Sequence, residues 1–166
     1  SDVYKRQADK YPGTACYVGE SIWDVIKNQG IKVDVALPCA TQNEIDGAQA
    51  EALMKNGCIC ISEGANMPST PEAIKYYQEY YALYGPGKAA NAGGVATSGL
   101  EMSQNSMRLS WGRKEVDSRL HEIMKNIHKT AIQASETYGK KGDYVLGANV
   151  AGFLKVANAM LAYGVV

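Results

Sequence analysis

Short apolar runs alternate with longer segments of helical periodicity in the first half of the chain. Four runs, at residues 15–18, 31–37, 58–62 and 82–84, are rich in strand-forming residues and are bounded by turn-forming residues such as Gly and Pro. Each run is short enough to be a buried strand. The pattern therefore predicts four strands.

Helices are predicted between these strands. Residues 43–56 place apolar side chains at helical spacing, with Asn43 as the expected N-cap and Gly57 as the stop. Thr70 is the expected N-cap of a following helix, with Pro71 at its first position, where a missing N–H group does no harm. Strand–helix–strand alternation with short loops predicts βαβ units and a parallel sheet, an α/β fold.

From about Gly94 onward the pattern is helical only. Three apolar faces predict three helices, and the segment 139–143 separates the last two. The faces are Val95, Met102 and Leu109; then Val116, Leu120, Ile123, Ile127, Ala131 and Ala134; then Val150, Phe153, Leu154, Ala157, Met160 and Leu161.

Charge and length narrow the classes of function. The 17 basic and 17 acidic residues cancel, which argues against a broad electrostatic footprint for nucleic acid or anionic lipid. We find no apolar run near the roughly 18 residues that span a bilayer and no secretory signal pattern, so a cytoplasmic location is expected. A small-molecule or protein partner is favoured.

No metal site is predicted. His121 and His128 lie on one helix face but about 10 Å apart by helical rise, too far for one ion, and Lys125 stands where a zinc-protease motif needs its second histidine. Both histidines are expected at a surface or interface. The four cysteines lack the paired spacing of a zinc site and are expected to be buried, reduced thiols.

Small, conformationally permissive residues dominate the segment from Gly64 to Asn105, which suits close approach of backbone to a ligand. Its alternative is a glycine-rich connection between two helices. The carboxyl ends of parallel strands are where open α/β sheets bind ligands, and here they carry amides or a hydroxyl beside small residues: Thr41 and Gln42, then Asn66, then Asn91. Amides suit ribose hydroxyls and a carboxamide, as in the nicotinamide half of a dinucleotide, although capping and turn roles explain the same spacing.

Ser98 follows the helix start at residues 91–94. One interpretation places its hydroxyl one turn into the helix, near free backbone N–H groups that bind an anion such as a carboxylate. The other is a helix-interior serine that donates a hydrogen bond back to a carbonyl. The spacing leaves both open.

Four ordered motifs together resemble the C-terminal part of bacterial hexameric glutamate dehydrogenase, of the Glu/Leu/Phe/Val dehydrogenase family. The motifs are ALPCATQNEID at 36–46, EGANMPST at 63–70, GPGKAANAGGVATSGLEMSQNS at 85–106 and GANVAGFLKVANAM at 147–160. The resemblance runs from about residue 8 to the end. It implies reversible oxidative deamination of L-glutamate to 2-oxoglutarate and ammonia, with NADP expected as cofactor and NAD as the other option.

The resemblance also implies site residues and an organisation. Ser98 would hold the distal carboxylate of glutamate, with Val95 packed against the substrate chain. Ala40, Thr41, Gln42, Asn66 and Asn91 would lie around the nicotinamide ribose and ring. The catalytic lysine and aspartate of the family, and its pyrophosphate loop, belong to upstream segments, so the chain alone is expected to be an inactive fragment of a homohexamer active in nitrogen assimilation.

The resemblance divides the chain into three parts. Residues 8–92 would form a partial dinucleotide-binding, Rossmann-like domain, and residues 93–166 a helical segment that returns toward an N-terminal domain. Residues 1–7 fit nothing that follows and are expected to be a non-native leader.

Two other functions remain under consideration. A non-catalytic module that binds a nucleotide or an amino acid could keep the strand-end loops without the chemistry. A related dehydrogenase for apolar amino acids would need an apolar residue where Ser98 stands, so Ser98 disfavours it.

Overall fold

The computed structural model describes residues 6, 9–14, 19–80 and 82–164. The predicted strand at 15–18, which includes Cys16, lies outside these residues. The described elements run in the order α2 (Ile22–Gln29), β1 (Val35–Ala36), α3 (Gly47–Lys55), β2 (Cys60–Ser62), α4 (Pro71–Glu79), β3 (Leu83–Gly85), α5 (Gly87–Ala90), α6 (Ala92–Met107), α7 (Arg113–Tyr138) and α8 (Tyr144–Tyr163).

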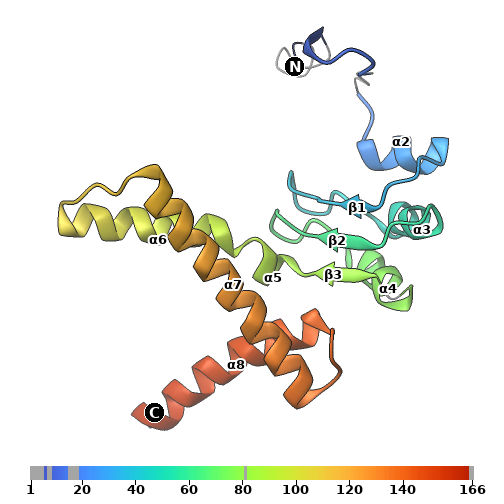
Figure 1. The fold of residues 1–166 in the computed structure, drawn as a ribbon. Coiled ribbons are helices and arrows are strands. Elements are labelled where there is room, and N and C mark those ends of the chain that lie inside the picture. The colour runs from blue at the N-terminus through green and yellow to red at the C-terminus, as the bar shows by residue number, and fades with distance from the viewer. Residues whose placement is uncertain (1–5, 7–8, 15–18, 81, 165–166) are drawn as a thin grey trace.

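The three strands form one parallel sheet in the order β1-β2-β3. Ala36, Ile61 and Tyr84 share a register position, and all three side chains are buried in the core with residues of α3 and α4. Figure 1 shows α3 and α4 packed beside the sheet, with α5 directly after β3. The predicted βαβ alternation and parallel sheet are confirmed.

The strands β1 and β2 are shorter than predicted, whereas β3 has the predicted length and is shifted by one residue. Pairing begins only at Val35 and Cys60, so the ladder covers two residues of the expected 31–37 strand and three of the expected 58–62 strand. The opposite face of the sheet is open in this part of the chain, where Val35 and Leu83 are 52% and 60% exposed. A strand pattern therefore extends beyond the residues that are actually paired.

Helix starts follow from side-chain caps. The Thr70 hydroxyl accepts a hydrogen bond from the Ala73 N–H, and Pro71 is the first residue of α4, as predicted. The predicted cap of α3 is wrong: Asp46 is the N-cap, and its carboxylate and the Gln49 side chain each accept a bond from the other residue's N–H. Asn43 instead lies in a turn with φ of 55°.

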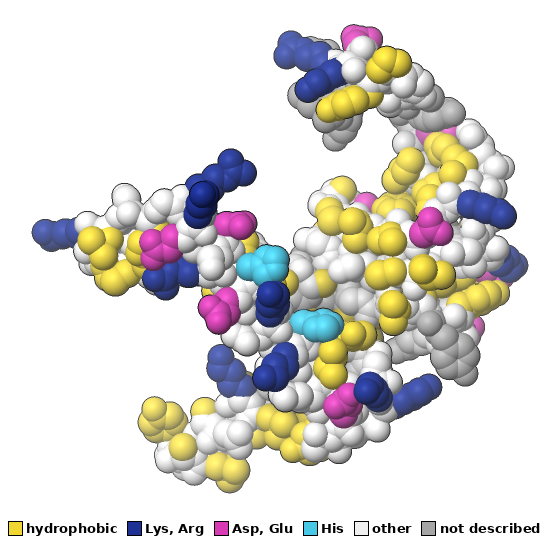
Figure 2. Space-filling model, viewed as in Figure 1, with side chains coloured by type: hydrophobic (Ala, Val, Ile, Leu, Met, Phe, Trp, Pro, Cys, Tyr) yellow, Lys and Arg dark blue, Asp and Glu magenta, His cyan; other side chains and the backbone are white. Residues whose placement is uncertain are grey.

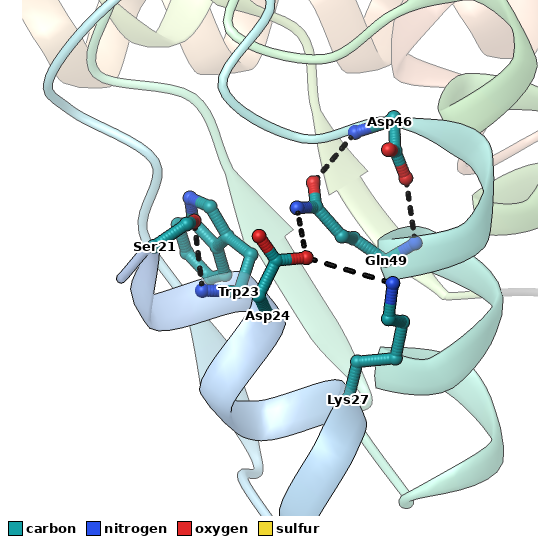
Figure 3. Close-up of polar contacts among 6 residues, drawn as sticks. All are labelled: Ser21, Trp23, Asp24, Lys27, Asp46 and Gln49. Carbon is teal, nitrogen blue, oxygen red and sulfur yellow. Dashed lines mark hydrogen bonds and ion pairs between the residues drawn. The ribbon is translucent and has the colours of Figure 1, made fainter. Parts of the chain in front are cut away.

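A polar network joins α2 to α3 (Figure 3). The Gln49 amide donates to Asp24 at 2.8 Å, and Lys27 forms an ion pair with the same carboxylate at 3.5 Å. Ser21 caps α2 by accepting from the Trp23 N–H. These bonds connect the helix before β1 to the capping box of the helix after it.

The helical part forms an arm and a crossing helix. In Figure 1, α6 extends away from the sheet as an arm, α7 crosses α6 and runs diagonally back toward the side of the sheet, and α8 crosses the second half of α7. The helices α7 and α8 touch at Gly147, where an added Cβ would collide with the Ala131 carbonyl oxygen. The α7–α8 pair is therefore packed backbone against backbone.

The predicted apolar faces of these helices differ in exposure: the face on α7 is partly or fully buried, with Ala131 and Ala134 in the core, half of the face on α8 is exposed, and the face on α6 is exposed throughout. Val95 and Met102 are 79% and 70% exposed, and α6 has no buried residue. Figure 2 shows hydrophobic side chains on the arm and toward the end of α8. Helical periodicity identified the helices, but it could not say what covers them.

By length and composition, α8 could cross a membrane. This corrects the expectation that no apolar run approaches that length. One such helix is weak evidence, because helices of soluble proteins pass the same test. Its first turns pack on α7, as the Gly147 contact shows.

Candidate functional site

Three strand-end loops meet at one edge of the sheet. The backbone N–H groups of Gly64 and Ala65 donate to the Pro38 carbonyl, which joins the loop after β1 to the loop after β2. The Glu63 N–H donates to the Gly85 carbonyl, which joins the loop after β2 to the end of β3. The predicted convergence of these loops is therefore present.

The first loop is shaped by Glu44, a residue that the sequence analysis did not single out. One carboxylate oxygen accepts from the backbone N–H groups of Ala40 and Thr41 at 2.9 and 3.3 Å, and the other accepts from the Trp23 indole at 3.1 Å. Ala40, Thr41 and Gln42 are all exposed. Glu44 therefore occupies two backbone donors of this loop, whereas the polar side chains of Thr41 and Gln42 are exposed.

The first and second loops lie against each other without room for a side chain at one point. A Cβ on Gly64 would collide with the Cys39 sulfur. Farther along, the Asn43 N–H donates to the Met67 carbonyl, and both residues have positive φ. Asn66, between these contacts, is exposed.

Glu63 joins the second loop to the third. It is only 3% exposed, and its Oε2 accepts a hydrogen bond from the Gly87 N–H at 2.7 Å. Its Oε1 is buried and has no hydrogen-bond partner among the described residues. Burial, and then the negative charge of Glu63, raises the pKa of the Tyr84 hydroxyl in the neighbouring core.

Asn91 also joins these two loops. Its amide donates to the Ala65 carbonyl at 3.0 Å, so one of its N–H groups supports the loop. Lys88, one turn earlier in α5, donates to Asn149 of α8 at 2.6 Å. The third loop is thus held both to its neighbouring loop and to the last helix.

The structure changes the local argument for Ser98. Helix α6 begins at Ala92, so Ser98 is its seventh residue and lies beyond the first-turn N–H groups, not one turn in. Its Oγ donates to the Gly94 carbonyl at 3.3 Å, the back-bonding alternative. Ser98 and Val95 share an exposed helix face, and the Ser98 oxygen can still accept a hydrogen bond.

The small-residue segment is not a loose connection. Residues 87–90 and 92–107 form α5 and α6, and a Cβ added at Gly93 would lie at ordinary van der Waals distance from side chains of Met124 and Leu120 of α7. Gly94 and Gly99 face open space. The helix therefore faces α7 near Gly93 and is uncovered at Gly94 and Gly99.

The expectations for cysteine and histidine differ in outcome. Cys58 is buried and Cys60 partly buried, but Cys39 is exposed because it follows β1 in the loop, so burial was wrong for this residue. Both histidines are exposed, as predicted, and His128 lies 3.3 Å from the Tyr144 hydroxyl.

A cavity of about 350 Å³ lies between the open face of the sheet, α5, α7 and α8. Its lining includes Leu83, Ala89, Ile127 and Ala131. None of the predicted site residues lines it. The cavity is therefore distinct from the loop edge.

The groups at the loop edge suit the nicotinamide half of a dinucleotide. Thr41, Gln42 and Asn66 offer exposed hydroxyl and amide groups of the kind that bond ribose hydroxyls and a carboxamide. Gly64 lies close to Cys39, and Gly87 lies close to Glu63 and Ala65. These contacts fix the positions of the loop backbones relative to one another. An open parallel sheet with such loops is typical of dinucleotide-dependent enzymes.

Comparison with known proteins gives the family. A model of the Glutamate/Leucine/Phenylalanine/Valine dehydrogenase family matches residues 3–164, and the chain belongs to this family. The glutamate dehydrogenase of Bacteroides thetaiotaomicron is 55% identical over 166 residues, covering 98% of this chain and 35% of that protein. The NADP-specific glutamate dehydrogenase of Escherichia coli K12 is 56% identical over 136 residues, covering 82% and 30%.

Comparison with solved structures leads to the same family. A crystal structure of Plasmodium falciparum glutamate dehydrogenase superposes with a TM-score of 0.87 at 45% identity, covering 98% of this chain and 34% of that one. The chain thus spans about a third of the length of the curated relatives it matches. The predicted α/β class, a Rossmann-like parallel sheet followed by a helical segment, is confirmed.

Proposed function

We propose that the protein containing this chain is a glutamate dehydrogenase, which converts L-glutamate reversibly to 2-oxoglutarate and ammonia with a nicotinamide cofactor. The observation that carries the proposal is the identity of 55% with a glutamate dehydrogenase over nearly the whole chain. The convergence of three amide- and hydroxyl-bearing loops at one sheet edge supports it independently.

In this proposal the loop edge binds the nicotinamide half of the cofactor through Asn66, Asn91 and residues 40–42. The bound cofactor would accept hydride from the substrate. Ser98 would hold the distal carboxylate of glutamate, and Val95 would pack against the substrate chain. Support comes from the shared exposed face of Val95 and Ser98, which starts one turn beyond Asn91.

The finer assignments rest on the resemblance. We infer that catalytic lysine and aspartate residues, and the pyrophosphate loop, belong to segments that precede the matched region, and that the 166-residue chain made alone does not turn over. NADP is the proposed cofactor, although relatives are named both NAD-specific and NADP-specific. The proposed complete enzyme is a cytoplasmic homohexamer in nitrogen assimilation.

The test is a steady-state assay of the full-length protein with glutamate or leucine, and with NADP or NAD. We expect glutamate-dependent reduction of NADP and little activity with leucine. Preferential turnover of leucine would refute the substrate assignment, and binding of cofactor without turnover of either amino acid would favour the non-catalytic module.

A further inference from the structure

The buried carboxylate of Glu63 connects two loops that are distant in the sequence. It lies at the end of β2, and its 2.7 Å bond to the Gly87 N–H crosses 24 residues of chain. A carboxylate that accepts an N–H bond forms a stronger link than a neutral acceptor does. Burying this charge is costly unless it is hydrogen-bonded. The link is therefore favourable only while the two loops stay close enough for the Gly87 N–H to reach Glu63.

On the other side of this link, Gly87 is packed too closely against its neighbours to accept a side chain without movement. A Cβ on Gly87 would lie 3.0 Å from both the Glu63 Oε2 and the Ala65 carbonyl oxygen, tighter than ordinary contacts. The Asn91 amide donates to that same Ala65 carbonyl. Two hydrogen bonds and one missing side chain therefore set the spacing between residues 63–67 and residues 86–91.

Asn66 lies on the first of these segments and Asn91 ends the second. On the basis of the proposed function, we propose that Glu63 is a positioning residue for the nicotinamide half of the cofactor. It sets the distance between the loops that carry Asn66 and Asn91, and it acts through the Gly87 N–H and not by touching the cofactor. A binding site needs its contact groups held within about 0.5 Å, so a small separation of the loops weakens binding.

Two substitutions disturb the link from opposite sides. Glu63→Met keeps the length of the side chain but removes the acceptor, whereas Gly87→Ala adds a Cβ against both Glu63 and Ala65. Glu63→Gln retains an acceptor for the Gly87 N–H. Leu53→Ala is the control, because Leu53 is fully buried on α3, outside both loops, and its truncation loosens the core.

The experiment uses the full-length protein and two probes, the reduced nicotinamide cofactor and an adenosine diphosphate that carries the same 2′ group as that cofactor. Glu63→Met and Gly87→Ala are expected to weaken binding of the reduced cofactor about tenfold or more and to leave the adenosine probe unchanged. The KM for cofactor rises in parallel, whereas kcat at saturating cofactor stays near wild type. Glu63→Gln stays close to wild type, and Leu53→Ala lowers stability without changing either affinity.

Unchanged cofactor affinity in both variants overturns the inference. A parallel loss of affinity for both probes also overturns it, because that result indicates a general structural role. If Glu63→Met fails to fold, Gly87→Ala carries the test. A wild-type protein that binds no reduced cofactor refutes the proposed function itself, which separates the two failures.

Discussion

Adding one methyl group at Gly147 is predicted to separate α7 from α8. A Cβ there would collide with the backbone carbonyl of Ala131 and come within 3.2 Å of the Ser135 Cβ. No side-chain rotation relieves a clash with backbone, so the two helices must move apart. Overpacking of this kind costs about 1–3 kcal/mol.

Gly152→Ala is the matched control on the same helix. Nothing lies within 4 Å of a Cβ at Gly152, so this change adds only helix propensity, worth about 0.5–1 kcal/mol of stabilisation. Both variants gain the propensity term, and their difference reports the collision alone. We therefore expect Gly147→Ala to be less stable than Gly152→Ala by about 3 kcal/mol, toward the upper end for overpacking.

Urea unfolding followed by far-ultraviolet circular dichroism measures this difference. Asn149 lies two residues from Gly147 and accepts a bond from Lys88 of α5. A shift of α8 in Gly147→Ala should therefore also disturb this bond between α8 and the third loop. Equal unfolding midpoints for the two variants would refute the close helix contact and the packing argument built on it.

Three further predictions concern the core and its caps. Tyr77→Phe removes the buried 3.2 Å bond between the Tyr77 and Ser69 hydroxyls and should lower the free energy of unfolding by about 1–2 kcal/mol. Adding Ser69→Ala to this variant should lower the free energy of unfolding little further, because the bond is already lost. Additive losses in urea unfolding would contradict this. Burial raises the pKa of Tyr77 and of Tyr84 above that of a free tyrosine, so the folded form keeps protons that the unfolded form loses. The contribution of these two tyrosines to stability should therefore be constant up to about pH 10 and fall above it, by up to about 1.4 kcal/mol per pH unit for each tyrosine. Tyr77→Phe should reduce the slope, and a flat profile from pH 9 to 11 would oppose this. Asp46→Ala should cost about 1 kcal/mol through loss of the α3 capping box, and an unchanged thermal midpoint would argue against that box.

The order of elements was predictable because local signals repeat along the chain. Thr70 and Pro71 start a helix in the structure as they do in the pattern, and each strand ends in a loop with small residues. Boundaries were less certain. Asn43 and Asp46 both fit a cap, and only the pairing of Asp46 with Gln49 three residues later distinguishes them.

The internal contacts of the site were not predictable in the same way. Glu63 and Gly87 are 24 residues apart, and Glu44 reaches Trp23 across 21 residues, so no periodic signal links either pair. Loop convergence followed from the parallel topology, whereas the groups that fix the loop spacing required coordinates. A charged residue directly after an apolar strand, as in Glu63, was the available signal.

The outer faces of α6 and α8 show a different limit. Their apolar periodicity is clear, yet Val95 and Leu161 are each 79% exposed in the described chain. Periodicity reports that a face is apolar, but its partner is set by tertiary and quaternary contacts that a local pattern does not encode.

The role of Ser98 tests the central claim most directly. Ser103 is its matched control, because it lies on the same helix, is exposed, and likewise donates to the carbonyl four residues earlier, at 2.8 Å. In steady-state kinetics of the full-length protein, Ser98→Ala should lower kcat/KM for glutamate by about tenfold or more, the loss of a hydrogen bond to a charged group, with KM for cofactor unchanged. Ser103→Ala should behave as wild type, and equal kinetics for the two variants would contradict the proposed glutamate site on α6.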